Sequence, residues 1–370
     1  MAGRSTFGNV RRLESGRWQA RYLHEGKRFS APQTFAAKAD ASAWLSTIEA
    51  DLRRGAWIDP EAGAVTFAAY ATAWLDQRHD LRPRTRDDYE SLLKVHLLPA
   101  FGPLALVSIT TSKVRIWHST LAKTAPARAA KGYRLLRTIL GTATTDRHII
   151  TNPCQVKGAG VEHSKERSLP TIAEVDALAA AMPERLALLV ILAMWASLRR
   201  GELLALVRSD FDLLKGTVRI ERAVVELANG TYLTGEPKTE AGRRTVYLPP
   251  HLLPSVQAHL VTYVAADPGA LVFTNLAGGA LSAHLLQHHW ERARKAAGVG
   301  CHLHDLRHLG ATLSATTGAT TKEIMYRLGH ASPQAALRYQ HATEDRNATL
   351  AAALSELVPN APVVPITAAH

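Results

Sequence analysis

The segment Leu198-Arg199-Arg200-Gly201-Glu202 holds a guanidinium group and a carboxylate at a spacing that suits the binding of an anion. Arg199 is expected to close the apolar helix that precedes it. Residues three apart on a helix lie on neighbouring turns, so Glu202 can orient Arg199 toward a ligand. The same pair is also typical of a structural ion pair, so this segment alone does not establish a site.

A second segment, His302-Leu303-His304-Asp305-Leu306-Arg307-His308, places two imidazoles and a guanidinium on one face of a predicted helix. His304 and His308 have the spacing of the HExxH zinc motif. Asp305 stands where that motif has Glu, however, and Arg307 would put a cation beside the metal, so a zinc site is disfavoured. His308 is expected to be structural, packing or hydrogen bonding behind the face that carries the chemistry.

A third segment, Leu328-Gly329-His330, is followed nine residues later by Tyr339. A single tyrosine in an Ala-rich helical segment is usually a core residue. Tyr326 is the competing tyrosine. It belongs to an apolar pattern with Ile324 and Leu328 and is expected to lie in the core.

Taken in order, these segments resemble the active-site set of the tyrosine recombinase (phage integrase) family. The resemblance also uses Pro237-Lys238-Thr239, followed by Arg243 or Arg244, and it spans most of residues 169–350. One departure is Leu309-Gly310, where many relatives carry a hydroxyl residue and a bulky one, which puts only the local packing in question. The matched set consists of Arg199, Lys238, His304, Arg307, His330 and Tyr339, with Glu202 and His308 in support.

The resemblance implies DNA strand transfer that needs neither a metal ion nor ATP nor any other cofactor. Tyr339 would attack a phosphodiester, forming a 3′-phosphotyrosine and releasing a 5′-hydroxyl that can later reverse the step. Arg199 and Arg307 would clamp the non-bridging oxygens. Lys238, near the tip of a β-hairpin, would protonate the leaving group. His304 would assist proton transfer or orient the phosphate, and His330 would donate a hydrogen bond to it.

Composition agrees with a polyanionic partner. The chain has 370 residues with 44 Lys and Arg against 32 Asp and Glu, a formal net charge of +12. Such an excess suggests nucleic acid or an anionic membrane surface, the alternative being a solvated basic surface. The longest apolar run, between Arg185 and Arg199, is shorter than the ~20 residues of a membrane span. Without a signal peptide or a disulfide framework (Cys154 and Cys301 only), a reduced cytoplasmic protein is expected, nucleoid-associated when bound to DNA.

The elements expected around the site define a multidomain, mainly α protein with small β-sheets. Residues 1–60 are predicted to form a small basic sheet (Trp18–Tyr22, a turn at Glu25-Gly26, then Lys27–Phe29) with one helix, resembling an arm-type DNA-binding domain. A linker is expected at Trp57–Pro60. Residues 65–150 read as helices, interrupted at Pro99–Pro103, and resemble the family's SAM-like core-binding domain.

The largest unit, residues 168–350, is predicted to be a mixed α+β catalytic domain, followed by a tail at 351–370. Its strand signals are Thr217–Arg222, an Asn229-Gly230 hairpin and Thr245–Leu248. The tail is expected to be disordered or to dock on another protomer. Basic residues proposed to contact DNA are Arg17, Arg21, Lys27, Arg28, Arg84, Arg86 and Lys131.

The expected partners are double-stranded DNA attachment sites, on which the chain would act as a homotetramer, with a host DNA-bending factor and an excisionase as further partners. Integration and excision of a phage or another mobile element is the favoured role, because the extra basic sheet domain suggests a second DNA site. The alternatives are a type IB topoisomerase-like enzyme, a dimer-resolving recombinase and a catalytically inert DNA-binding regulator. A metal-dependent nuclease is disfavoured because Asp305 is isolated.

Overall fold

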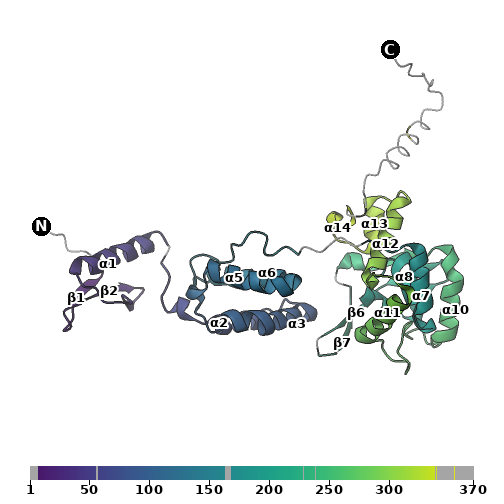
Figure 1. Cartoon of the computed structure of the whole chain (residues 1–370), viewed down its shortest axis with the longest axis horizontal. Helices are drawn as coiled ribbons and strands as arrows, with labels where there is room; N and C mark the ends of the chain where they lie inside the picture. Colours follow the sequence, from purple (N-terminus) through teal and green to yellow (C-terminus); the bar gives the residue numbers. More distant parts are fainter. Residues whose placement is uncertain are drawn as a thin grey trace, which may run out of the picture. The chain divides into compact units, whose positions relative to one another are not determined.

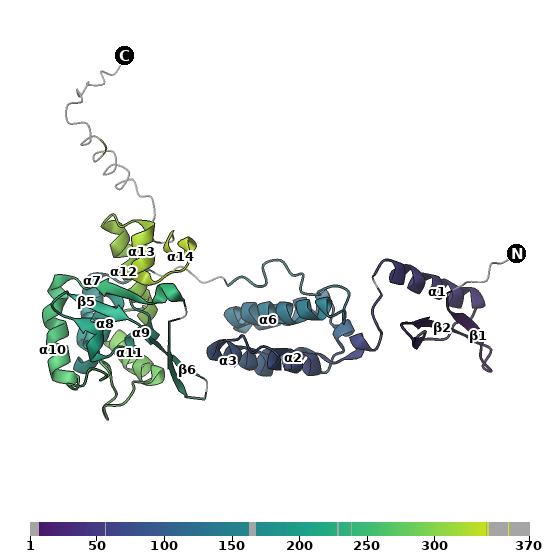
Figure 2. The ribbon, with the colours of Figure 1, turned by 180° about the vertical axis from the view of Figure 1, so that it is seen from behind.

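A computed structural model of the chain describes residues 7–55, 57–162, 168–227, 229–237, 239–337, 339 and 354. The chain divides into two compact units, residues 1–164 and 165–370, which are described separately. Figures 1 and 2 show the elements of each unit from opposite sides. In the described part of the chain, no helix is both long enough and apolar enough to cross a membrane.

The first unit begins with a three-stranded antiparallel sheet in the order β1-β2-β3. The turn between β2 and β3 falls at Glu25 and Gly26, both of which have positive φ, as the sequence predicts. Alternate residues of β2 face the helix α1, and Ala20 and Tyr22 are buried against it. The elements are β1 (Asn9–Arg12), β2 (Trp18–His24), β3 (Lys27–Ser30) and α1 (Lys38–Arg53).

Trp57 belongs to the core of this sheet domain, so its prediction as part of a linker is wrong. Its indole Nε1 donates a hydrogen bond to the hydroxyl of Tyr22 over 2.7 Å. Its ring also meets the ring of Phe29 edge to face, with 5.1 Å between centroids. A large aromatic residue gains more from such burial than from exposure in a linker, and the apolar neighbours of Trp57 are far from it in sequence.

The rest of the first unit is helical and surrounds a second core, to which Phe67, Leu97, Phe101 and Leu136 contribute fully buried side chains. Figures 1 and 2 both show α6 beside α3. The predicted interruption at Pro99–Pro103 is confirmed, because α4 ends at Phe101, inside that stretch. The helices are α2 (Phe67–Asp76), α3 (Pro83–Leu92), a π-helical turn (Leu93–Leu97), α4 (Leu98–Phe101), α5 (Thr111–Thr124) and α6 (Pro126–Thr145), with 3₁₀ turns at Ala62–Ala64 and Leu106–Ser108.

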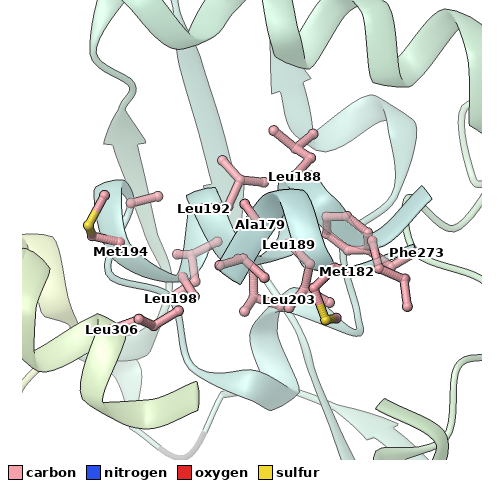
Figure 3. Close-up of a cluster of buried hydrophobic side chains, with 14 of the residues drawn as sticks. Ala179, Met182, Leu188, Leu189, Leu192, Met194, Leu198, Leu203, Phe273 and Leu306 are labelled. Atoms are coloured by element: carbon pink, nitrogen blue, oxygen red, sulfur yellow. The ribbon is translucent and has the colours of Figure 1, made fainter. Parts of the chain in front are cut away.

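The second unit is built on α8, a mostly buried helix that packs against α7, α10 and α12. Figure 3 shows Met194, Leu198 and Leu306 in the same buried cluster, so the chain after α8 and the start of α12 share one core. This shared core holds the segments of Arg199 and Arg307 together. The helices are α7 (Ile172–Ala181), α8 (Glu184–Trp195), α9 (Arg200–Leu203), α10 (Leu253–Tyr263), α11 (Ala283–Ala297), α12 (Leu303–Thr316), α13 (Thr321–Leu328) and α14 (Pro333–Leu337).

Two small antiparallel sheets complete the second unit, with strand orders β4-β5-β8 and β6-β7. The Asn229-Gly230 signal lies between β6 and β7, where Glu226 pairs with Tyr232, so the predicted hairpin is confirmed. In β8, Arg244 and Val246 are buried and Tyr247 is exposed. The strands are β4 (Phe211–Asp212), β5 (Thr217–Ile220), β6 (Ala223–Glu226), β7 (Tyr232–Gly235) and β8 (Arg244–Tyr247), and 3₁₀ turns lie at Arg208–Asp210, Glu240–Gly242 and Pro250–Leu252.

Candidate active site

Arg199 does not close the apolar helix before it, contrary to the sequence prediction. α8 ends at Trp195, Ser197 takes a positive φ of 53°, and Arg199 becomes the N-terminal cap of the separate helix α9. Its Nη1 donates to Oε1 of Glu202 over 2.7 Å, and its Nη2 donates to the carbonyl of Gly329 over 2.9 Å. The predicted pair is therefore present, and 38% of the Arg199 side chain remains exposed to receive a ligand.

Glu202 is held from its other side by Arg244, which the sequence does not distinguish from Arg243. Arg244 Nη2 donates to Oε2 over 2.9 Å and Nη1 donates to Oε1 over 3.2 Å, with both side chains almost fully buried. Burial opposes ionisation of Glu202, but Arg244 and Arg199 outweigh it and hold the pKa of this carboxyl below its usual value. The signal that identifies Arg244 is the period-two pattern of β8, in which it shares the buried face with Val246.

Arg307 is buried at the centre of the site, with 2% of the residue exposed. Its Nη1 donates to the carbonyl of Ser197 and its Nη2 to the carbonyl of Leu328. Burial and the nearby Arg199 cation lower the pKa of Arg307 to about 9. These two contacts use two of the five N–H donors of a guanidinium, and an anion that accepted bonds from the others would offset the cost of burying this charge.

Gly310 explains how Arg307 reaches the Ser197 carbonyl, and it is the residue that departs from the family pattern. A Cβ at Gly310 would stand 2.0 Å from the Met194 carbonyl oxygen and 2.5 Å from Ser197 Oγ. Only glycine therefore lets α12 approach the end of α8 this closely.

Replacing Gly310 by Ala is expected to destabilise the fold by about 1–3 kcal/mol, because the added methyl overpacks the contact between α12 and α8. Urea unfolding would measure the loss of stability. Gly300→Ala is the matched control, because a Cβ there has open space and its φ is not positive. Equal stability of the two variants would contradict the expectation.

The hydroxyl of Tyr339 lies at 2.5 Å from Nδ1 of His308. His308 is therefore in contact with the phenol, and the prediction that it lies behind the active face is wrong. The rings of His304 and His308 meet edge to face with 4.8 Å between centroids, and the ring of His330 lies nearly parallel to that of Tyr339 at 6.4 Å. Tyr339 is buried, with 8% of the residue exposed. Three histidines and the tyrosine thus form one cluster, drawn from α12 and from the chain that follows α13.

His304 is exposed as a residue, while its ring contacts the ring of His308. Partial burial of the imidazole, His308 and the Arg307 cation together lower the pKa of His304 to about 4. His304 is thus neutral at pH 7 in the free protein. A bound phosphate diester would favour its protonated form, because an opposite charge at short range raises the pKa of an imidazole.

Tyr326 is 61% exposed, so its prediction as a core residue is wrong. Ile324 and Leu328 are buried on α13, and the helical period turns Tyr326 away from them.

Asp305 accepts a hydrogen bond from the backbone N–H of His302 and caps α12. In the described part of the chain, no group of three or more His, Cys, Asp or Glu side chains is placed to hold a metal ion. Lys238 and the tail at 351–370, apart from residue 354, lie outside the described residues.

The residues expected to contact DNA differ in their surroundings. Lys27 pairs with Glu61 over 2.6 Å, Arg84 with Asp87 over 3.0 Å, and Arg86 with Glu90 over 3.3 Å. Arg17 donates to the side chain and carbonyl of Thr34. Ion pairs at such exposed positions contribute about 0–1 kcal/mol, so these cations can exchange their partners for phosphates at little cost. Arg21 is half-buried, and Arg28 and Lys131 are exposed.

Comparison with known proteins decides the family. Residues 168–346 match the sequence profile of the Phage integrase family. Residues 6–54 match the Phage integrase, N-terminal domain, and residues 66–122 match the Phage integrase, N-terminal SAM-like domain. A protein of Mycobacterium tuberculosis named as a prophage phiRv2 integrase is 41% identical over 96% of this chain and 97% of its own length. The chain belongs to the phage integrase family. Membership makes it a site-specific DNA recombinase, and the predicted family is confirmed.

Other similar proteins support the same family assignment. The integrase of Mycobacterium phage L5 is 33% identical over 96% of this chain and 98% of its own length. The fold is similar to that of the Tn1549 transposon integrase in complex with transposon right end DNA, with a TM-score of 0.69 and 18% identity over 79% of this chain and 100% of that chain. It is also similar to a lambda integrase dimer bound to a core site, with a TM-score of 0.60 and 19% identity over 99% of this chain and 100% of that chain. The predicted fold class, mainly α with small sheets, is confirmed.

Proposed function

We propose that this recombinase cuts and rejoins DNA through a covalent 3′-phosphotyrosine at Tyr339, without a metal ion or a nucleotide cofactor. The observation that carries the proposal is the convergence of Arg199, Arg307 and Tyr339 from distant parts of the chain. Arg199 and Arg307 both donate to backbone carbonyls at the end of α13, Gly329 and Leu328. The Tyr339 phenol contacts His308, which follows Arg307 on α12.

The charge of the site suits the chemistry. Attack on a phosphodiester concentrates negative charge on its non-bridging oxygens, and two preorganised guanidinium groups stabilise that charge more in the transition state than in the ground state. Arg199 keeps an exposed face for this purpose, and Glu202 fixes its orientation. We assign Lys238 as the acid that protonates the departing 5′-oxygen, and His304 and His330 as phosphate ligands.

We further propose that residues 1–60 bind arm-type DNA sites, residues 65–150 and 168–350 hold the crossover duplex, and a homotetramer acts on two duplexes. Support comes from the net charge of +12 and from the exposed cations of β3 and the helical region. Solved relatives include a lambda integrase tetramer bound to a Holliday junction. Integration and excision of a phage or other mobile element, assisted by a host DNA-bending factor and an excisionase, is the role that fits this architecture best.

Covalent capture tests the mechanism. The full-length protein would be incubated in EDTA with duplex DNA flanking its own gene, and SDS-stable protein–DNA adducts would be resolved on a gel. Wild type and Tyr326→Phe are expected to form an adduct, and Tyr339→Phe is expected to form none. Tyr326→Phe is the matched control because it removes the same hydroxyl from an exposed tyrosine. An adduct with Tyr339→Phe, or a requirement for a divalent metal ion, would overturn the proposal.

A further inference from the structure

We infer that His308 is the proton acceptor for the Tyr339 nucleophile, an assignment that rests on the proposed function. The contact that carries it is direct, since Nδ1 of His308 stands 2.5 Å from the phenolic oxygen, the atom that would attack phosphorus. The rings are tilted by 37° with 5.6 Å between centroids, so the imidazole meets the hydroxyl through its nitrogen. His308 touches the reacting atom itself.

The position of His308 on α12 fixes this contact. The preceding residue, Arg307, is anchored by hydrogen bonds to two backbone carbonyls, so the helix cannot turn without breaking them. Gly310, two residues later, presses the same turn of α12 against the end of α8. One rigid helical turn therefore sets both the guanidinium that would hold the phosphate and the imidazole that holds the nucleophile. Such preorganisation is what proton transfer at a reacting centre requires.

The ordinary pKa values of a tyrosine and an imidazole suit proton transfer from Tyr339 to His308. A tyrosine hydroxyl has an ordinary pKa of ~10, so at pH 7 it must lose a proton as it attacks. An imidazole with an ordinary pKa of ~6.5 lies close to the working pH, where general bases are most effective. When the neutral imidazole carries its proton on Nε2, Nδ1 is free to accept the phenolic proton. The tautomer in which His308 Nδ1 accepts the hydrogen bond from Tyr339 is therefore also the tautomer in which His308 can accept the proton.

The two other histidines of the cluster suit this role less well. His304 contacts the ring of His308, and the lowered pKa of His304 makes it a weak proton acceptor in the free protein. His330 lies with its ring nearly parallel to the Tyr339 ring, at an angle of 19°, which favours stacking between the two faces. Among the described contacts of His308 are His304 on its own helix and Tyr339 opposite.

The step balances without a further reactant. As the bond from the Tyr339 oxygen to phosphorus forms, the O–H bond breaks and its proton moves to Nδ1 of His308. The bond from phosphorus to the 5′-oxygen breaks, and that oxygen takes a proton from Lys238. In the reverse step a 5′-hydroxyl returns a proton to Lys238, and the tyrosine oxygen leaves with the proton held by His308. Both groups then regain their starting states.

A rate measurement separates proton transfer from positioning. The assay is single-turnover adduct formation on the duplex identified by covalent capture, with wild type, His308→Asn and the control His288→Asn, whose imidazole is exposed on α11. An Asn amide can still accept the hydrogen bond from Tyr339 but cannot take its proton. His308→Asn is expected to slow adduct formation about 10²-fold and His288→Asn less than about twofold.

Two rescues make the test specific. With 3,5-difluorotyrosine at position 339, whose phenol ionises far more readily, the deficit of His308→Asn should fall below about tenfold. A substrate with sulfur in place of the bridging 5′-oxygen, which leaves without a proton, should rescue Lys238→Ala and leave His308→Asn slow. A rate for His308→Asn within threefold of wild type, an unchanged deficit with difluorotyrosine, or rescue by the sulfur substrate would each overturn the assignment.

A measurement on the free protein keeps this assignment distinct from the proposed function. In a ¹⁵N-histidine NMR spectrum, Nδ1 of His308 should resonate as a hydrogen-bonded acceptor, and Tyr339→Phe should shift that resonance toward the position of an unbonded acceptor. No shift would overturn the assignment whether or not DNA is cut. A shift without any wild-type adduct would mean that the contact exists but the proposed function fails.

Discussion

Arg307→Lys is expected to slow adduct formation about 10³-fold, because it removes a fixed guanidinium from the position where the phosphate charge develops. Arg307 is anchored by the carbonyls of Ser197 and Leu328, which leaves further N–H donors pointing from a rigid plane. A lysine at the same place has one flexible ammonium that cannot hold both carbonyls and clamp two phosphate oxygens together. The variant keeps the positive charge but loses the planar guanidinium, so it separates the effect of charge from the effect of geometry on the rate.

The measurement is again a single-turnover rate, with DNA binding followed separately. Because many cations contribute to binding, Arg307→Lys should change DNA affinity far less than the rate of the chemical step. Arg292→Lys, an exposed position on α11, is the matched control and should behave as wild type. A rate for Arg307→Lys within tenfold of wild type would show that charge alone suffices.

Glu202→Gln is expected to destabilise the protein by about 3–5 kcal/mol, because removing one member of a buried ion pair leaves the other without a counter-charge. Arg244 is that other member, and its side chain is fully buried beside the carboxylate. Arg199 would lose the same carboxylate, so we also expect slower strand transfer. Urea unfolding would measure the loss, and Glu221→Gln, an exposed surface pair, should change stability by less than about 1 kcal/mol.

The same pair predicts a pH dependence of stability. The pKa of Glu202 is held below its ordinary value of 4.5, so its stabilising contribution is fully present above pH 4.5 and is lost as the pH falls through the lowered value. Glu202→Gln should therefore flatten this part of the acid unfolding profile. The double variant Glu202→Gln, Arg244→Met should be less destabilised than the sum of the single variants, since no buried cation is left unpaired. Simple additivity would contradict a direct interaction.

Much of the site could be predicted from the chain alone, because its motifs are local. The spacing from Arg199 to Glu202 and the helix that carries His304 and Arg307 depend on neighbours within one or two turns. Both the Asn229-Gly230 hairpin and the buried face of β8 follow from turn chemistry and period two. The family resemblance follows from the order of these local segments.

Other features of the site depend on contacts between residues far apart in the sequence, which only the tertiary structure shows. The Ser197 carbonyl meets Arg307 across 110 residues, Glu202 meets Arg244 across 42, and His308 meets Tyr339 across 31. Local periodicity says which face of an element is apolar, but it does not say which distant residue that face will meet. The same reason explains why Trp57 was predicted to lie in a linker and why the contact of His308 with the phenol was not predicted. Long-range packing selects the partner, and here it brings an imidazole to the oxygen of Tyr339.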